Sequence, residues 1–199
     1  MKNKNRFNKE FWEAKYKVND TFWDIGEIST PIKEYIDQIH NKEIQILIPG
    51  AGNGYEAEYL INKGFKNVTV IDFSEQPLIN LKQRLPKIKK EQLIHQDFFE
   101  HKNTYDLIIE QTFFCALDPS LRKNYVFKMN DLLTNNGKLV GLLFDFELTS
   151  ETPPFGGNKK EYLELFSKKF NIKTLEKCHN SIKPRLGTEL FFIFEKKQY

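Results

Sequence analysis

Short apolar segments alternate with helical segments along most of the chain, and this alternation constrains the possible fold more than any other feature. The predicted strands span residues 44–48, 68–72, 92–95, 105–110, 138–146, 172–177 and 189–194. The predicted helices span residues 8–18, 30–40, 55–63, 75–85, 119–133 and 158–170. Because parallel strands are joined through crossover helices, this order predicts a mostly parallel sheet with helices on both faces. The expected fold class is α/β, doubly wound.

The last two predicted strands have no helix between them, so we expect one of them to run antiparallel. The chain has 199 residues, a length typical of one domain, and we expect a single domain over residues 1–199. Hydrophobic residues make up 40% of the chain and 18 residues are Phe, which excludes intrinsic disorder as the overall state.

Composition also excludes several classes of partner. The net charge is only +3, which gives little of the basic field that nucleic acids require, so we expect no nucleic acid partner. No apolar run approaches the roughly 20 residues of a membrane span, and the N-terminus has no secretory signal. The two cysteines, Cys115 and Cys178, form no disulfide framework, which favours the cytoplasm. The four histidines are scattered, so no metal site is expected.

The segment after the first predicted strand is glycine-rich and indicates a ligand site. Gly50, Gly52 and Gly54 let the backbone turn sharply beside the next helix and approach a ligand closely. Asp72 lies about 20 residues further on, at the end of the second strand, where a carboxylate can accept hydrogen bonds from both ribose hydroxyls. Together the two features predict a nucleoside ligand.

The details of this loop favour S-adenosylmethionine over NAD. Tyr55 stands where a dinucleotide fingerprint has its third glycine, and S-adenosylmethionine has no pyrophosphate that needs this glycine. Asp97 follows the third strand, where its carboxylate can accept from the amine of adenine, and Phe98 offers an apolar wall. Taken alone, Asp97 is better interpreted as the N-cap of a helix.

Further segments carry a family resemblance. They are residues 11–13 (Phe-Trp-Glu), 21–24 (Thr-Phe-Trp-Asp), 48–54 (Ile-Pro-Gly-Ala-Gly-Asn-Gly), 112–117 (Thr-Phe-Phe-Cys-Ala-Leu), 153–157 (Pro-Pro-Phe-Gly-Gly) and 185–189 (Arg-x-Gly-x-Glu). In these segments the chain resembles the thiopurine S-methyltransferase family, most closely its halide and thiol methyltransferase branch. The resemblance implies the class I S-adenosylmethionine-dependent methyltransferase fold, a Rossmann-like seven-stranded sheet. It also implies that residues 1–40 form a helical cover over the cofactor site.

The resemblance assigns roles to individual residues. The implied cofactor-binding residues are Trp12, Tyr16, Trp23, Gly50, Gly52, Asp72, Asp97, Phe98 and Gln111. The first three would contact S-adenosylmethionine from the cover, Gly50 its methionine part, and Gln111 its sulfonium region. Tyr16 stands where plant members have Trp, and Gln111 where they have Tyr. The residues that carry the chemistry stay open, and the candidates for the acceptor pocket are Tyr16, Phe113, Phe155 and Arg185.

The implied activity is transfer of a methyl group to a small soft nucleophile, such as a thiol, bisulfide, thiocyanate or a halide, with S-adenosylhomocysteine as the product. Aromatic residues would line the pocket: Phe7, Phe11, Phe113, Phe114 and Phe155. Arg185 would steer an anionic acceptor or form a structural ion pair. Cys115 is interpreted as a buried apolar residue. The alternatives are methyl transfer to oxygen or nitrogen of a small molecule, or S-adenosylmethionine binding without catalysis, and we expect a monomer.

Overall fold

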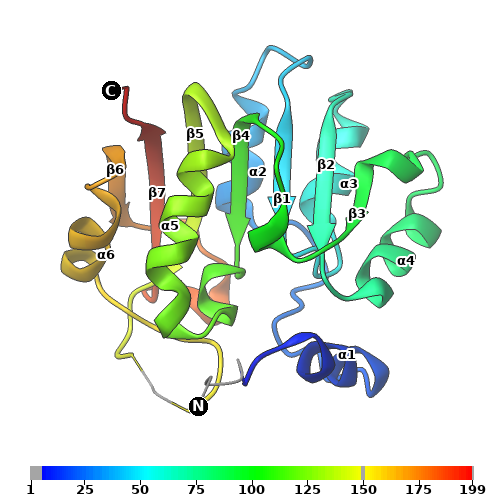
Figure 1. Ribbon diagram of the computed structural model, residues 1–199, viewed down its shortest axis with the longest axis horizontal. Coiled ribbons are helices and arrows are strands. Elements are labelled where there is room, and N and C mark those ends of the chain that lie inside the picture. The colour runs from blue at the N-terminus through cyan, green and yellow to red at the C-terminus, as the bar shows by residue number, and fades with distance from the viewer. Residues whose placement is uncertain (1–5, 149–150, 199) are drawn as a thin grey trace.

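The computed structural model describes residues 6–148 and 151–198. Its centre is a seven-stranded sheet with the strand order β3-β2-β1-β4-β5-β7-β6 (Figure 1). The strands are β1 (Ile46–Pro49), β2 (Val68–Asp72), β3 (Leu93–His95), β4 (Tyr105–Gln111), β5 (Leu133–Phe144), β6 (Phe170–Lys177) and β7 (Glu189–Lys196). Strand β7 runs antiparallel to β5 and β6, and the remaining neighbours are parallel. The expectation of a mostly parallel sheet with one antiparallel strand is confirmed.

Helices cover both faces of this sheet. They are α1 (Lys9–Lys17), α2 (Thr30–Asp37), α3 (Tyr55–Asn62), α4 (Glu75–Arg84), α5 (Arg122–Asp131) and α6 (Lys159–Phe166). One core holds Tyr125 of α5 and Phe166 of α6. The other holds Ile36 of α2, Leu60 of α3 and Leu81 of α4. Figure 1 shows α5 and α6 in front of the sheet and α2 and α3 behind it.

Burial on both faces explains why the central strands are continuous apolar runs. In β1, Ile46 and Ile48 join the core beneath α2 and α3, and Leu47 joins the core beneath α5. Successive side chains of a strand point to opposite faces, so a strand buried on both sides needs an apolar residue at every position. All four residues of β1 are buried.

Several boundaries differ from the expectations. The predicted helix over 119–133 is divided into a short 3-10 turn, Pro119–Leu121, and α5. Strand β5 begins at Leu133 rather than at 138, because buried Leu133 pairs with Tyr105 of β4. The expected turn before Lys138 lies inside the strand as an irregularity, with Asn136 at φ 63°. The predicted helix over 158–170 ends at Phe166, since Phe170 is buried and starts β6.

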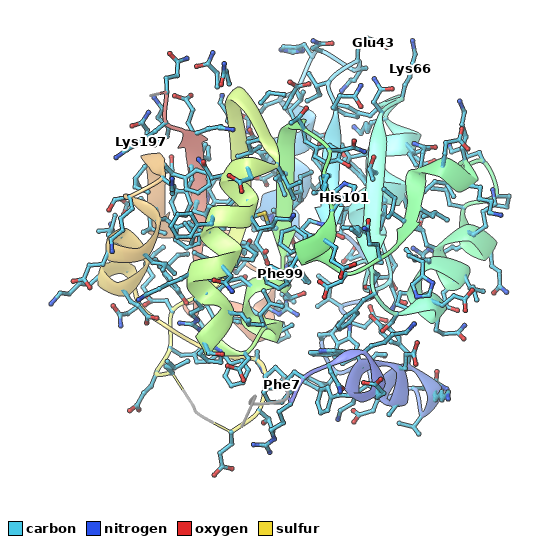
Figure 2. All side chains as sticks on the ribbon, viewed as in Figure 1. Phe7, Glu43, Lys66, Phe99, His101 and Lys197 are labelled. Atoms are coloured by element: carbon cyan, nitrogen blue, oxygen red, sulfur yellow. The ribbon has the colours of Figure 1, made fainter. Side chains whose placement is uncertain are left out.

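The segment before β1 crosses the carboxyl ends of the parallel strands. Helix α1 lies below these ends in Figure 1, and Figure 2 shows Phe7 beside it, at the opposite end of the molecule from the ion pair of Glu43 and Lys66. None of the residues of α1 is buried. The first five residues of the expected cover lie outside the described part of the chain. Within the described residues, no helix is long and apolar enough to cross a membrane.

Candidate functional site

A cavity of about 280 Å³ lies where the carboxyl ends of the parallel strands meet the N-terminal segment. Its walls come from residues 7–27, from the glycine-rich loop after β1, and from the loops after β2, β3 and β4. Ligands of open α/β sheets bind at this edge. All nine residues that the sequence assigns to the cofactor line this one cavity: Trp12, Tyr16, Trp23, Gly50, Gly52, Asp72, Asp97, Phe98 and Gln111.

The glycine-rich loop needs its glycines for two different reasons. Gly50, Gly52 and Gly54 all have positive φ, at 72°, 50° and 67°, which side chains other than glycine rarely adopt. At Gly50 there is also no room, because a Cβ atom would lie 2.6 Å from Cδ2 of Phe113. The loop after β1 is therefore pressed against the loop after β4, and both form one floor of the cavity.

Asp72 ties this loop to the next one. One carboxylate oxygen accepts from the backbone N–H of Ala51 at 2.8 Å, and the other accepts from the N–H of Ser74 at 2.8 Å. The side chain is only 9% exposed, and burial raises the pKa of its carboxyl to about 6, against the opposing effect of these hydrogen bonds. Each oxygen keeps a second lone pair, so the carboxylate can still accept from a ligand hydroxyl.

Asp97 and Phe98 follow β3 at the edge of the cavity. The Asp97 carboxylate accepts from the N–H of Phe99 at 2.8 Å, so it caps the short 3-10 helix Phe98–Glu100. The capping role that the sequence left as an alternative is thus present, and it leaves lone pairs for a ligand. The Phe98 ring is buried and packs against Phe113 with ring centroids 5.2 Å apart.

Glu110, near the end of β4, organises the loop after that strand and was missed by the sequence reasoning. Its carboxylate accepts from the N–H groups of Phe113 and Phe114 at 2.7 and 2.9 Å, and from the hydroxyl of Tyr125 at 2.6 Å. Burial raises the pKa of the Glu110 carboxyl to about 7, although these donors oppose the rise. The available signal was an acidic residue at the end of an otherwise apolar strand.

This carboxylate holds a strained turn. Thr112, between Gln111 and Phe113, has φ 60°, a left-handed conformation that is costly for a β-branched residue. The turn directs Phe113 onto Gly50 and places Gln111 in the cavity wall. Strain of this kind persists only where surrounding contacts enforce it, and the two amides held by Glu110 supply those contacts.

Gln111 has one polar end without a partner. Its Oε1 accepts from the Ser29 hydroxyl at 2.8 Å, which joins β4 to the N-cap of α2. Its Nε2 is buried and has no hydrogen-bond partner in the described structure. A buried donor left unpaired costs free energy, so Gln111 is suited to donate to a bound ligand or acceptor.

The N-terminal cover is held by aromatic rings. Trp23 makes edge-to-face contacts with Trp12 and Tyr16, with ring centroids 5.4 and 5.6 Å apart. Phe11 continues the series from Trp12 to Phe7, with both centroid distances at 5.2 Å. Asp24, another residue that sequence reasoning missed, accepts a hydrogen bond from the Asn53 side chain of the glycine-rich loop. These contacts hold the cover over the side of the cavity that faces away from the sheet.

Three of the four candidates for the acceptor pocket line the cavity. Tyr16, Phe113 and Arg185 are wall residues, whereas Phe155 is not; it is fully buried behind the wall, where its ring contacts Phe7 at a centroid distance of 5.3 Å. Burial and the nearby carboxylates of Asp72 and Asp24 raise the pKa of the Tyr16 hydroxyl, so Tyr16 stays protonated.

The other aromatic residues expected in the pocket wall differ in position. Phe7 lines the cavity, Phe11 supports it through Phe7, and Phe114 lies in the core with its ring 4.9 Å from that of Tyr125. Phe114 is drawn inward because its N–H bonds to buried Glu110. Cys115 is buried, and burial raises the pKa of its thiol, which confirms the interpretation as a buried residue.

Arg185 forms the structural ion pair that was one of its two expected roles, and steering of an anionic acceptor stays a prediction. Its guanidinium lies 3.6 Å from the buried Glu189 carboxylate and donates to the carbonyl of Trp23 at 2.9 Å, and it lines the cavity. It therefore fixes the end of the cover and places positive charge at the wall. Across residues 6–148 and 151–198, no cluster of three or more His, Cys, Asp or Glu side chains is arranged to hold a metal ion.

Comparisons with known proteins show which family and which fold this chain resembles. The family model described as "Thiopurine S-methyltransferase (TPMT)" matches residues 7–198. "Probable thiol methyltransferase 2" of Arabidopsis thaliana is 28% identical over 184 residues, 89% of this chain and 81% of that protein. "Thiocyanate methyltransferase 1" of the same plant is 26% identical with the same coverage. The crystal structure of Burkholderia thailandensis 1,6-didemethyltoxoflavin-N1-methyltransferase with bound S-adenosylhomocysteine shares the fold, with a TM-score of 0.72 and 17% identity over 95% of this chain and 86% of that one.

Replacing Glu110 with Gln tests the buried carboxyl through the pH dependence of stability. The folded protein keeps a proton on Glu110 up to about pH 7, whereas the unfolded chain loses it near the ordinary value of 4.5. The free energy of unfolding should therefore fall as pH rises through this window, by up to roughly 3 kcal/mol from this group. Denaturant unfolding at pH 5.0 and 7.5 should show a smaller decrease in Glu110→Gln than in the wild type.

Glu91→Gln is the control, because Glu91 is exposed on the surface and should leave the decrease unchanged. Equal decreases in the wild type and in Glu110→Gln would contradict the assignment of a neutral, buried Glu110 carboxyl.

Proposed function

The chain belongs to the thiopurine S-methyltransferase family and is an S-adenosylmethionine-dependent methyltransferase, and we propose that it methylates a small soft nucleophile. The proposed acceptors are thiols, bisulfide, thiocyanate and halides. The observation that carries this proposal is the pairing of the unpartnered Gln111 amide with the aromatic wall at Phe113. Such a wall receives a polarisable anion, and the amide donates to it. The names of two plant relatives, a thiol and a thiocyanate methyltransferase, agree with this acceptor class.

The residues of the cavity fit S-adenosylmethionine. Asp72 would accept from the ribose hydroxyls, and Asp97 and Phe98 would hold adenine. Gly52 has no atom within 4 Å of the place its Cβ would take, so it leaves space beside the backbone for the methionine part, and Gly50 lets the same loop turn there at a positive φ. Aromatic rings attract cations, so the Trp12, Tyr16 and Trp23 rings of the cover suit a sulfonium. Gln111, whose buried Nε2 has no hydrogen-bond partner in the described structure, lines the same cavity.

Bound S-adenosylmethionine supplies a methyl group activated by the positive charge on sulfur. The protein's task is therefore alignment and exclusion of water rather than acid–base chemistry. Among the described wall residues there is no histidine or lysine, and the pKa values of Tyr16 and Cys115 are raised. An acceptor that arrives as an anion, or ionises easily by itself, needs no such group to remove its proton. We assign no residue as a general base.

We further propose that residues 1–199 form one methyltransferase domain, with residues 1–40 as the cover, and that the protein acts as a monomer in the cytoplasm. Support for the cover comes from the lining contributed by Trp12, Tyr16 and Trp23. Two free, buried cysteines agree with a reducing compartment. The net charge of +3 favours a small-molecule acceptor over nucleic acid.

Asp72→Ala tests the cofactor site. The substitution removes charge-assisted hydrogen bonds to the ribose, so the dissociation constant for S-adenosylhomocysteine should rise at least about tenfold. Thermal stability should also decrease, because the N–H groups of Ala51 and Ser74 lose their partner. Isothermal titration calorimetry measures the affinity, and a thermal melt measures the stability.

Asp106→Ala is the matched control for this experiment. The Asp106 carboxylate likewise accepts from a backbone N–H, that of Gln45 at 2.9 Å, and from the Thr134 hydroxyl at 3.0 Å, but at the amino end of β4. It should lower stability and leave the affinity unchanged. An unchanged dissociation constant in Asp72→Ala would refute the ribose assignment.

The acceptor class is tested by initial rates with a panel of acceptors. A dry aromatic wall favours anions that lose water easily, so iodide, bisulfide and small thiols should react fastest. Chloride should be far slower, and amines and hydroxyl compounds negligible. With thiols, the rate should climb as pH approaches the pKa of the acceptor, since no protein group is proposed to form the thiolate.

The same panel separates the alternatives. Turnover of a phenol or an amine above every sulfur and halide acceptor would favour an O- or N-methyltransferase instead. Tight binding of S-adenosylhomocysteine without turnover of any acceptor would favour a binding protein without catalysis.

A further inference from the structure

The charged residues that line the cavity are strongly unbalanced. Arg185 is the one cationic side chain among the described wall residues, and five carboxylates stand against it: Asp24, Glu27, Glu56, Asp72 and Asp97. Asp24, Asp72 and Asp97 each accept hydrogen bonds from the chain itself. Glu27 is exposed to solvent. Among the five, Glu56 is the buried carboxylate that accepts from no other residue in the part of the chain that the structure describes.

Glu56 is the second residue of α3, directly after the glycine-rich loop, and is 8% exposed. No hydrogen bond and no ion pair within 4.0 Å joins its carboxylate to another side chain in the described part of the chain, and a donor to it is its own backbone N–H. Its neighbour Glu58 is paired with Arg84 at 2.6 Å, and Glu110 is held by three donors. Arg185, the cation of the wall, is engaged by Glu189 and by the carbonyl of Trp23.

Burying a carboxylate that no other residue compensates costs free energy, and at Glu56 this cost appears as a raised pKa. Burial raises the pKa of the Glu56 carboxyl to about 6, with its own N–H, Arg185 and Arg84 opposing the rise. At neutral pH the group is still mostly ionised. A ligand cation with N–H donors would compensate this charge in the cavity.

The order of the strands shows which part of the ligand reaches Glu56. The sheet order is β3-β2-β1-β4, so the loops carry Asp97, Asp72, the glycine-rich loop and Gln111 in that sequence across the cavity. Adenine and ribose belong to the first two loops in the proposed function. The methionine part therefore lies over the loop after β1, which runs directly into α3 and Glu56.

We propose that Glu56 is a specificity residue for the cofactor and accepts hydrogen bonds from the α-ammonium group of its methionine part. This inference rests on the proposed cofactor site. The sulfonium has no N–H donors and is served by aromatic rings, whereas an ammonium group has three donors that need acceptors. Glu56 thus makes the site prefer an adenosyl ligand with its amino-acid part intact.

Two ligands that differ in this part test the role of Glu56. S-adenosylhomocysteine carries the ammonium group, and 5′-methylthioadenosine has the same adenine, ribose and sulfur without the amino-acid part. Calorimetry at pH 7.5 should show that Glu56→Gln weakens S-adenosylhomocysteine about ten- to a hundredfold. Binding of 5′-methylthioadenosine should change less than about twofold. The apo variant should melt at or above the wild-type temperature, because an uncompensated buried charge is removed.

Glu75→Gln is the matched control, since Glu75 is the first residue of α4, the helix after the next strand, and is exposed outside the cavity. It should change neither affinity. A second measurement needs only the wild type. As pH falls through about 6, Glu56 takes up a proton and loses its attraction for the ammonium group, so S-adenosylhomocysteine should weaken relative to 5′-methylthioadenosine. Asp72 titrates in the same range, but it contacts the ribose that both ligands share, so its protonation should leave the ratio of the two dissociation constants unchanged.

Each outcome decides the inference. Equal weakening of both ligands by Glu56→Gln would mean that Glu56 only shapes the cavity. Unchanged affinities would mean that it does not contact the ligand. Either result overturns the proposal and leaves the cofactor site in place. A pH-independent ratio in the wild type overturns it as well. If the wild type binds neither ligand, the proposed cofactor site itself fails, and the inference fails with it.

Discussion

Backbone N–H groups that extend past the carboxyl ends of parallel strands must find acceptors, and in this protein carboxylates supply them, two of them buried (Asp72 and Glu110) and one exposed (Asp97). Asp72 accepts from Ala51 and Ser74, Asp97 from Phe99, and Glu110 from Phe113 and Phe114. Each carboxylate fixes the first turn of a loop after a strand. Unpaired N–H groups there would cost free energy, so the loops have little freedom to differ from this arrangement. The cavity is the space that these fixed loops enclose.

The cover is attached by a different kind of interaction. Helix α1 has no buried residue. The cover is held by edge-to-face pairs among Phe7, Phe11, Trp12 and Trp23, and by hydrogen bonds at Lys9, Asp24 and Arg185. Such ring pairs contribute only about 0.5–1.5 kcal/mol each beyond their burial. The floor of the site is therefore rigid, and the cover is held less strongly. This division allows a ligand to enter a preformed floor and be enclosed from above.

The sequence predicted the fold well because the central strands are buried on both faces. The continuous apolar runs that end at Asp72 and near Glu110 are typical of strands buried on both faces, and their alternation with helices predicted the parallel sheet. The boundaries at Leu133 and Phe170 were missed because pairing with Tyr105 and burial at the sheet edge override local helix and turn signals. Tertiary contacts of this kind leave no local pattern.

The site was predicted in part for the same reason. Glycine spacing and Asp72 follow a rule of parallel sheets, and family resemblance added Trp12, Tyr16, Trp23 and Gln111. Glu110 and the proposed role of Glu56 were missed because both depend on burial, and a sequence does not show which acidic residue of a helix or strand faces the interior. Phe155 was expected in the pocket wall, but it lies behind the wall because the loop after β5 packs its ring against Phe7, a tertiary contact that the sequence does not show.

A crystal structure of the protein with S-adenosylhomocysteine tests the central claim most directly, since the claim concerns where the fixed loops hold the cofactor. We predict the ribose hydroxyls on the Asp72 carboxylate, adenine beside Asp97 and Phe98, and the amino-acid part beneath Trp12 and Trp23. Electron density for the ligand outside this cavity, or with its ribose away from Asp72, would contradict the account.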